Sequence, residues 1–444
     1  MTRLRHFVLP LLALIASPSL PAQLVHFGPW LGGVTPRSAE VVLGLIEDRL
    51  TSIDVCLKPD FLRYDSLAEN RRLLTAPPKL VRYTLTNLEP DTTYYYRVRA
   101  GNLKERERTG SFRTFPEAGR PSSFRFAIGA DALTDSKSSV FSEIRFQKPR
   151  FFIHLGNFHS VPILTPDPAK YYETFKTALR SSNQSELYSS VPIVYTWDRS
   201  DFGGERANRF SAQVPVANEV YRNIVPHYPL VTDESTKTKV APAAERPALI
   251  SQAFSYGRVR FIILDTRSAR DPVATPDGPE KSMLGEWQCD WLKQELVTAA
   301  ETHPLIFIAS STAWHGIDSA NSDDWARYTH ERTEIAAWIR DHNITGVCFL
   351  SGNGGVFATN DGSKVFTQSE LNFPEFHVGP IDLKRVAYRG EWTQVPIVPD
   401  EVDEFFGLVD VEDNVTSIKV SFTGLNQYAQ IELKSAFTVP VPRR

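Results

Sequence analysis

The chain has 444 residues, of which 42% are hydrophobic and 23% are charged, so it is long enough for two or three domains with buried cores. Its formal net charge is −3 at pH 7, whereas a protein that holds nucleic acid through the phosphates needs a basic excess. The composition therefore indicates an ordinary globular protein and argues against a nucleic-acid partner.

Residues 1–22 have the pattern of a secretory signal peptide. Arg3 and Arg5 precede the apolar run FVLPLLALIA, and small residues follow up to Ala22. The apolar run is too short, and too interrupted by Pro10, to cross a bilayer, and no other stretch approaches that length. We therefore expect a secreted or periplasmic protein, cleaved near Ala22, with no integral membrane segment after cleavage.

Residues 24–115 alternate between apolar and polar side chains in the way that predicts β-strands. The strand-like runs are SAEVVLGL (38–45), SIDVCL (52–57), VRYTLTNL (81–88) and TYYYRVRAG (93–101). The segment LEPDTTYYYRV resembles the end strands of fibronectin type III domains, in which the hydroxyl of Tyr94 would bond back to the preceding loop. Leu88 and Tyr96 would face the core. We expect a small all-β sandwich that ends at the Pro-, Gly- and Ser-rich segment 114–123.

Residues 124–435 alternate between strand-like and helical segments, which predicts a layered α/β domain. The expected strands are FRFAIGA, RFFIHLG, VPIVYTW, RVRFIILD, PLIFIASS and GVCFLSG, and the expected helices are 137–147, 171–181, 285–301 and 331–342. In the last helix, Ile335, Trp338 and Ile339 share one face. The pair FFGLVDVEDN and SIKVSFTG predicts an antiparallel hairpin that closes one sheet.

Three loops of this second region directly follow apolar strands. They read HLGNFHS (154–160), YTWDRSDFGG (195–204) and FLSGNGGVFAT (349–359). A fourth strand, FRFAIGA, leads into Asp131. Loops at the carboxyl ends of strands are where α/β proteins gather ligands and metals. We therefore expect these four loops to converge at one end of the sheets.

The order and spacing of these segments, together with KPRFFIHLG, SVPIVYTWD, YGRVRFIILDTRS, MLGEWQCDWLKQEL and FGLVDVED, resemble the PhoD-like alkaline phosphatase family. This family belongs to the calcineurin-like metallophosphatases, and the resemblance extends from about residue 24 to about residue 434. It implies a layered metallophosphatase β-sandwich flanked by helices, behind an accessory fibronectin type III-like domain. It also implies two metal ions and hydrolysis of phosphate mono- or diesters.

The metal loops of that family typically read Gly-Asp, Trp-Asp-Asp-His-Asp and Gly-Asp-x-His, and this chain departs from all three. Asn157 stands where the first motif has its metal-bridging aspartate. Arg199 and Ser200 replace an aspartate and the histidine of the second motif. Asn353 and Gly355 replace the aspartate and the histidine of the third. The resemblance therefore implies a family frame with altered ligands.

Two dications held about 3.5–4 Å apart repel strongly, and carboxylates must offset their charge. The neutral amide of Asn157 bridges metals poorly, Arg199 adds a positive charge, and Gly355 has no side chain. Only Asp131 still matches a family ligand. We expect either no cofactor or a single weakly bound divalent cation at Asp131, Asn157 and Asn353. Of these two, we favour hydrogen bonding of the polar residues within strand-end turns over a bound cation.

Arg199 admits two interpretations. We favour an ion pair with Asp131 or Asp198, in which the guanidinium fills the vacated cation position with its own charge. Alternatively, Arg199, Asn157, Asn353 and the glycine-rich backbone bind a phosphorylated or other anionic small molecule.

His159, His315 and Arg267 are the further candidates for a catalytic role. His159 lies two residues after Asn157, and His315 lies in STAWHGID after an expected strand. An isolated histidine can act as an acid or base, but it is more often structural. Arg267, in the segment LDTRS, can approach a substrate phosphate or form an internal ion pair.

We therefore expect an exported family member whose metal-dependent phosphoesterase activity is lost or strongly impaired. The alternative is an active alkaline phosphatase or phosphodiesterase with a reduced or rearranged metal site. A third hypothesis, a carbohydrate or cell-surface adhesion role, rests on the N-terminal sandwich alone.

Overall fold

The computed structural model describes residues 25–46, 51–67, 71–74, 79–100, 103–231, 248–317, 322–353, 355, 357–363, 372–385, 390–398 and 402–441. The expected signal peptide, residues 1–22, lies outside the described residues. Among the described residues, no helix is both long and apolar enough to cross a membrane.

Three β-sheets organise the described part of the chain. The largest has ten strands, in the spatial order β20 (Ile431–Pro440), β19 (Ser417–Asn426), β18 (Phe405–Asp413), β9 (Phe124–Gly129), β10 (Phe152–Leu155), β11 (Ile193–Thr196), β1 (Val25–Gly32), β2 (Ala39–Leu45), β6 (Lys79–Leu85) and β5 (Arg71–Leu74). The second has the order β12 (Gln252–Tyr256), β13 (Val259–Ile263), β14 (Leu305–Ser310), β15 (Val347–Ser351), β17 (Pro374–His377) and β16 (Ala358–Asp361). The third has the order β4 (Asp65–Leu67), β3 (Thr51–Cys56), β7 (Thr93–Ala100) and β8 (Leu103–Arg113).

The described α-helices are α1 (Val140–Phe146), α2 (Pro168–Arg180), α3 (Ser182–Ser190), α4 (Arg199–Phe202), α5 (Val214–Ile224), α6 (Gly285–Ala300) and α7 (Thr329–Asp341). A 3₁₀ turn spans Trp325–Arg327. Helix α2 begins where the sequence favours a start, because Pro168 stands in its first turn and the Asp167 carboxylate accepts a hydrogen bond from Ala169 N at 3.0 Å.

The ten-stranded and six-stranded sheets pack face to face. On β9, Phe126 and Ile128 point into the space between the sheets, whereas Ala127 points to the other face. The ring of Phe126 meets Phe261 of β13 edge-on at 5.3 Å and Phe307 of β14 at 5.4 Å. Each fully buried phenylalanine of this kind contributes roughly 1.5–3 kcal/mol of hydrophobic stabilisation. The period-two alternation of the sequence therefore places this aromatic layer.

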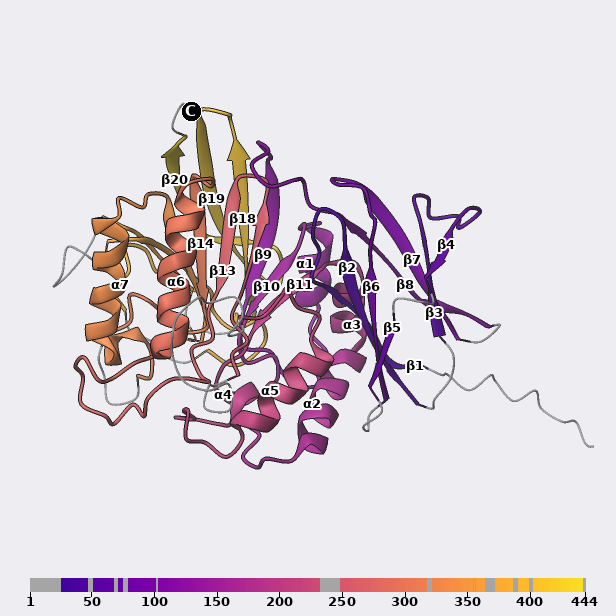
Figure 1. Cartoon of the computed structure of the whole chain (residues 1–444), viewed down its shortest axis with the longest axis horizontal. Helices are drawn as coiled ribbons and strands as arrows, with labels where there is room; N and C mark the ends of the chain where they lie inside the picture. Colours follow the sequence, from indigo (N-terminus) through magenta and orange to yellow (C-terminus); the bar gives the residue numbers. More distant parts are fainter. Residues whose placement is uncertain are drawn as a thin grey trace, which may run out of the picture.

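Helices cover both outer faces of the paired sheets. Figure 1 shows α6 and α7 on one side and α1, α2, α3 and α5 on the other. Buried residues of α6 and α7, such as Leu292 and Ile335, pack with Ile306 of the six-stranded sheet. The order helix–sheet–sheet–helix confirms the expected layered α/β fold.

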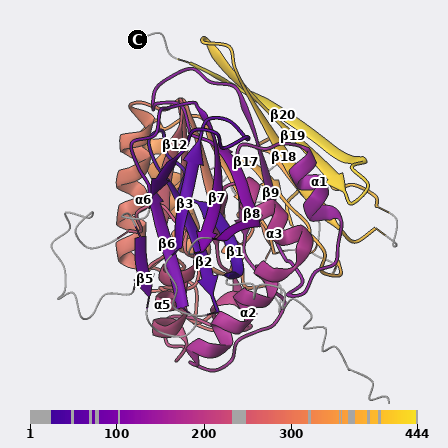
Figure 2. The ribbon, with the colours of Figure 1, turned by 90° about the vertical axis from the view of Figure 1, so that its right-hand side faces the viewer.

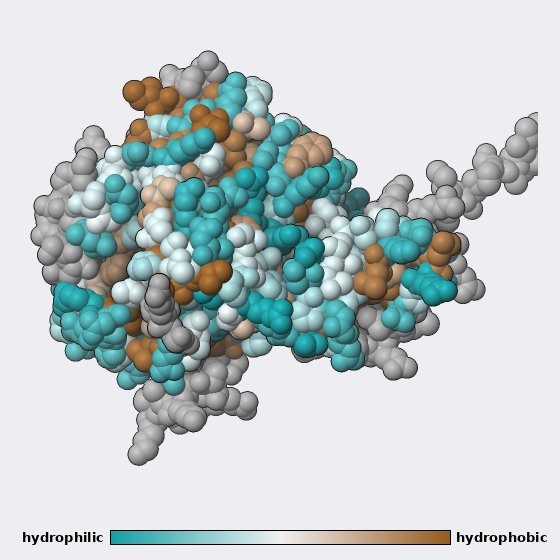
Figure 3. Space-filling view, turned by 90° about the horizontal axis from the view of Figure 1, so that it is seen from above, coloured by the Kyte–Doolittle hydropathy of each residue, from teal (hydrophilic) through white to brown (hydrophobic). Residues whose placement is uncertain are grey.

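Seen from above, most of the coloured surface is hydrophilic, and hydrophobic residues form small separate groups (Figure 3).

The N-terminal strands form the expected all-β sandwich. The four-stranded sheet lies on the side of the molecule opposite α6 and α7, and Figure 2 views the molecule from that side. Val41 of β2 shares its core with Val98 of β7. Tyr94 forms the expected corner, because its hydroxyl accepts a hydrogen bond from Glu89 N at 2.8 Å. Leu88 and Tyr96 are buried, as expected.

The sandwich shares a sheet with the rest of the chain. Strand β1 runs parallel to β11, with Gly32 opposite Ile193, so β1, β2, β6 and β5 extend the large sheet instead of forming a separate one. A continuous hydrogen-bonded ladder therefore joins the two regions that the segment 114–123 separates in the sequence. The boundaries 24–115 and 124–435 stay predictions.

Two side chains of the sandwich also bond to helices of the second region. The Arg82 guanidinium donates to Val225 O at 2.7 Å and to Arg222 O at 2.9 Å, at the carboxyl end of α5. The Tyr96 hydroxyl donates to Ser189 O of α3 at 2.6 Å. These contacts satisfy helix-end carbonyls and fix the sandwich against the helical layer.

A buried carboxyl in α7 gives the fold a pH dependence. Glu331 accepts hydrogen bonds from Met283 N at 2.6 Å and Leu284 N at 3.3 Å, just before α6. Burial raises the pKa of Glu331 from an ordinary 4.5 to about 7, against the effect of these bonds. Because the folded-state pKa is raised, the contribution to stability is complete below pH 4.5 and is lost as the pH rises through 7.

We expect Glu331→Gln to remove this dependence. Relative to the parent, the variant should gain about 3 kcal/mol of unfolding free energy between pH 4 and pH 8, since each pKa unit is worth about 1.4 kcal/mol. Urea denaturation across this pH range measures the difference. Glu301→Gln, at an exposed position, is the control and should follow the parent. An unchanged pH profile in Glu331→Gln would contradict the assignment.

Candidate functional site

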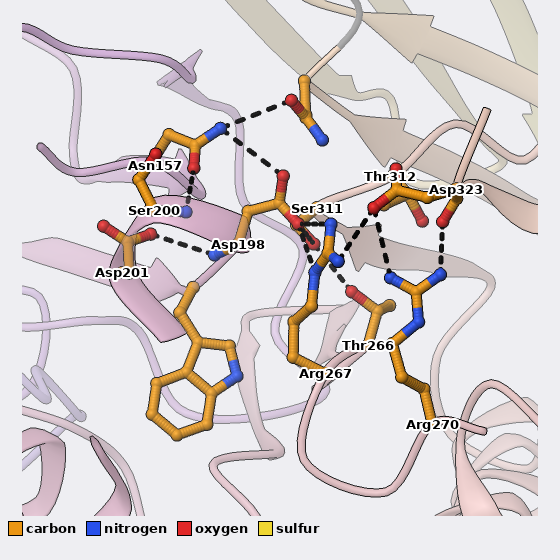
Figure 4. Close-up of polar contacts among 12 residues, drawn as sticks. Asn157, Asp198, Ser200, Asp201, Thr266, Arg267, Arg270, Ser311, Thr312 and Asp323 are labelled. Atoms are coloured by element: carbon orange, nitrogen blue, oxygen red, sulfur yellow. Dashed lines mark hydrogen bonds and ion pairs between the residues drawn. The ribbon is translucent and has the colours of Figure 1, made fainter. Parts of the chain in front are cut away.

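The four loops converge, and Asn157 lies at their meeting point (Figure 4). Its Nδ2 is 2.7 Å from Asp131 Oδ1, 3.3 Å from Asn353 Oδ1 and 3.4 Å from Asp198 Oδ2. These contacts join the loops that follow β9, β10, β11 and β15. The predicted convergence is therefore confirmed.

Three residues of this cluster share an unusual backbone conformation. Asp131, Asn157 and Asn353 have φ values of 59°, 49° and 59°, in the left-handed region that most side chains avoid. Asparagine and aspartate adopt this region more readily than other non-glycine residues because their short polar side chains bond locally. The sharp turn after each strand therefore favours these residue types independently of any metal.

The orientation of the Asn157 amide is set by its second partner. Asn157 Oδ1 accepts a hydrogen bond from Ser200 N at 2.9 Å, so the NH₂ group faces the carboxylates. The reverse orientation would place two donors against each other at Ser200 and two acceptors against each other at Asp131. Asn157 thus presents donors to the oxygens that a metal would need.

Asp201 has a structural role in the segment after β11. Its two carboxylate oxygens accept hydrogen bonds from Phe158 N at 2.8 Å and from Asp198 N at 2.9 Å. One side chain therefore connects the loops after β10 and β11 and supports the first turn of α4.

Two arginines form ion pairs with Asp198 and Asp323. Arg267 Nε donates to Asp198 Oδ1 at 2.7 Å, and its Nη2 contacts the same oxygen, while Nη1 lies 2.8 Å from Asp323 Oδ2. Arg270 Nη1 lies 3.5 Å from the same Asp323 oxygen. Asp198 and Arg267 are fully buried, so the network forms an internal chain of alternating charges (Figure 4).

The direct ion pair of Arg199 with Asp131 or Asp198, which we favoured, does not form, although the charge of Arg199 acts to lower the pKa of both acids. Within the described residues Arg199 enters no ion pair, and Asp198 is held by Arg267 instead. Arg199 begins the short helix α4 and is half-buried, whereas Arg267 reaches inward from the loop after β13. Arg267 adopts the internal ion pair, one of the two roles considered for it.

Burial raises the pKa of one acid of this centre, whereas nearby arginine charges lower the pKa of another. Burial raises the pKa of Asp131 to about 6. Against the cost of burial, the charges of Arg267 and Arg270 hold the pKa of Asp323 at about 2. Asp323 is therefore the anion that the arginines stabilise best.

The candidate imidazoles do not join this cluster. His159 lies fully buried against Phe175, with Nε2 3.6 Å from Asp201 Oδ1, and burial lowers its pKa to about 3. His315 Nδ1 is 2.7 Å from Glu375 Oε2 in a separate buried network. No group of three or more His, Cys, Asp or Glu in the described part of the chain is arranged to hold a metal ion.

The sequence pattern did not reveal Asp323 or Arg270. Asp323 lies in a segment without strand or helix periodicity, so nothing marked it as close to the loops. Arg270 stands three residues after Arg267, and this spacing on one loop was the available signal.

These residues do not fit a pair of metal ions. Asp131 Oδ1, Asn353 Oδ1 and Asp198 Oδ2 all face the Asn157 amide, and the other Asp198 oxygen faces Arg267. A single cation at Asp131, Asn157 and Asn353 would have to displace the amide donor from between them. Gly355 is buried and contributes no ligand atom from a side chain.

The comparisons with known proteins agree with this fold. The sequence pattern of PhoD-like phosphatases matches residues 163–404. The chain is similar to a solved structure described as PhoD, with 17% identity and a TM-score of 0.72 over 96% of this chain and 92% of the other. It is also similar to purple acid phosphatase PPD1 from yellow lupin (Lupinus luteus) seeds, with 13% identity and a TM-score of 0.59 over 93% of this chain and 74% of the other. No curated protein matches the chain. At these identities the structural likeness shows the fold alone.

We expect Asn157→Ala to destabilise the protein by about 2–4 kcal/mol, because Ser200 N–H and the Asp131 carboxyl would lose a buried partner and alanine would adopt a left-handed φ. Asn343→Ala is the matched control, since Asn343 also has a positive φ of 52° but is exposed. It should cost about 1 kcal/mol. Urea denaturation measures both values, and equal losses would show that the amide network adds no stability.

Proposed function

We propose that this chain, which belongs to the PhoD-like phosphatase family, has lost or strongly reduced metal-dependent phosphoesterase activity. The observation that carries the proposal is the Asn157 amide, whose NH₂ group lies among the three oxygens of Asp131, Asp198 and Asn353. Metal-dependent hydrolysis needs a cation at such oxygens to lower the pKa of a bound water and to offset transition-state charge. In this centre the oxygens are engaged by internal donors instead.

The location of the protein forms part of the same proposal. The pattern of residues 1–22 supports export, so we place the mature chain in the periplasm or outside the cell. N-terminal sequencing of the protein purified from its native compartment would reveal cleavage near Ala22.

An activity assay tests the proposal. We expect little hydrolysis of generic phosphate mono- and diesters by the purified protein, even with added divalent metal, and well under two metal equivalents per chain by elemental analysis. Metal-dependent turnover by the parent that Asp131→Ala abolishes would instead establish the alternative, an active enzyme with a rearranged site.

Restoring the family pattern gives a second arm of this test. The variant carries Asn157→Asp, Arg199→Asp, Ser200→His, Asn353→Asp and Gly355→His together. We expect it to gain metal and a small phosphoesterase activity. The gain should stay small because Arg267 still holds Asp198, and because Gly355 has a φ of 62° that histidine adopts only with strain.

Arg199 supports a second candidate function, the binding of a phosphorylated or other anionic small molecule. Its guanidinium forms no ion pair within the described residues, and Arg199 lies half-buried in the first turn of α4, next to Ser200. A guanidinium presents several fixed N–H donors to a phosphate or carboxylate.

Calorimetric titration with inorganic phosphate checks this candidate. We expect Arg199→Gln to weaken binding about tenfold or more, since a charge-assisted hydrogen bond contributes about 1.5–3 kcal/mol. Arg206→Gln is the control, because Arg206 is an exposed arginine in the following turn. Equal phosphate affinities for parent, variant and control would remove anion binding at Arg199 from consideration.

A further inference from the structure

The N-terminal sandwich carries a pocket that lies apart from the loops around Asn157, since none of its lining residues belongs to those loops. Its volume is about 930 Å³, within the size range of small-molecule sites. The pocket lies where β3 ends and β7 begins, and the connection from β3 to β4, residues 57–64, forms one wall. Buried side chains of the sandwich form its floor, namely Val55, Leu88 and Tyr94. The pocket therefore opens directly onto the core of the sandwich.

Three large apolar side chains of this wall are exposed. Leu62 is 82% exposed, Leu57 is 61% exposed and Tyr64 is 41% exposed, and all three line the pocket. Single exposed apolar residues are common on protein surfaces, but a group of them around a hollow marks a surface that contacts a ligand. The wall therefore offers apolar contact to whatever enters the pocket.

The Tyr64 ring is held in place from outside the pocket. The Arg97 guanidinium lies 4.9 Å from its centroid, and Arg99 Nη1 donates a hydrogen bond to its hydroxyl at 3.3 Å. Arg97 is itself fixed, because its Nε donates to Asp54 Oδ2 at 2.7 Å and its guanidinium also lies over the Phe61 ring at 4.5 Å. Since Arg97 is not among the lining residues, it covers the face of the Tyr64 ring that points away from the pocket. A ring fixed in this way loses little conformational freedom when a ligand stacks on its other face.

The charged side chains around the pocket balance each other. Lys58 and Arg63 are exposed bases of the lining, and Asp60 and Asp65 are exposed acids of it. A strongly charged ligand would meet attraction and repulsion of similar size there. A ligand rich in hydroxyl groups, in contrast, would find donors in the two bases and acceptors in the two acids. The lining therefore favours a neutral ligand with many hydroxyl groups.

We propose that this pocket binds a neutral saccharide, with one sugar ring stacked on Tyr64. A pyranose ring has an apolar face of C–H groups, and the negative face of an aromatic ring attracts them. The sugar hydroxyl groups point outward around the ring edge, where the charged side chains of the lining hydrogen-bond with them. Leu57 and Leu62 extend the apolar contact beside the aromatic ring. This inference gives the carbohydrate hypothesis a specific site, and it does not depend on whether the loop centre performs any chemistry.

Affinity gel electrophoresis and calorimetry of the purified protein test the proposal. The probes are soluble β-glucan, xylan and galactomannan, together with chitohexaose, and we expect the parent to bind at least one of them. Tyr64→Ala should weaken that binding about tenfold, because the stacking surface is lost. Tyr64→Phe keeps the ring and should bind like the parent. Tyr428→Ala is the matched control, because Tyr428 is 67% exposed in the turn between β19 and β20, and it should also bind like the parent.

A second variant, Leu62→Ser, decides the matter if Tyr64→Ala does not fold. Leu62 is 82% exposed, so we expect this variant to melt like the parent and to bind the saccharide roughly threefold more weakly or worse. The inference is overturned if the parent binds none of the probes, or if Tyr428→Ala loses as much affinity as Tyr64→Ala. Unchanged affinity in Leu62→Ser would also contradict it. Binding of an apolar dye at this pocket without binding of any saccharide would assign the pocket to an apolar ligand instead.

Discussion

The buried contact between Arg267 and Asp198 is the interaction on which the loop centre depends. It joins the loops after β11, in the ten-stranded sheet, and β13, in the six-stranded sheet. Breaking a buried ion pair by removing one partner typically costs about 3–5 kcal/mol, because the other charge stays buried. The Asn157 amide faces the other oxygen of Asp198, and Asp265 accepts a hydrogen bond from Arg267 N at 3.0 Å. The second arginine, Arg270, lies beside Asp323, which Arg267 also contacts. The centre is therefore stabilised by charge that the chain itself carries.

The sequence predicted the frame of this centre well, for a physical reason. Parallel neighbours such as β9, β10 and β11 end at the same edge of a sheet, so apolar runs followed by polar loops already imply convergence. The corner formed by Tyr94 and Glu89 was predictable because its partner lies a few residues away. The choice between Arg199 and Arg267 was not predictable, because it depends on which side chain points inward across the gap between sheets. His159 was a catalytic candidate because it follows Asn157 by two residues, but its ring lies buried against Phe175.

Some elements escaped the pattern because of where they lie in the fold. Strand β1 is buried on both faces, so VHFGPWLG has no alternation of apolar and polar residues that would mark a half-exposed strand. Strand β20 forms the outermost strand of the large sheet and is largely exposed, so IELKSAFTVP has no sustained pattern of buried apolar residues that would mark a strand. Periodicity detects an amphipathic element and misses one that is wholly buried or mostly exposed.

The shared sheet has a consequence for how this chain folds. Strand β1 is made early in synthesis, but its parallel partner β11 begins only at Ile193. Until that residue leaves the ribosome, the N-terminal sandwich carries an unpaired edge of backbone N–H and C=O groups. Such long-range parallel pairing forms slowly, since the intervening chain must first be closed into a loop. The nascent protein therefore passes through a stage in which β1 is open to pairing with another strand, and a chaperone that covers this edge would protect it from aggregation.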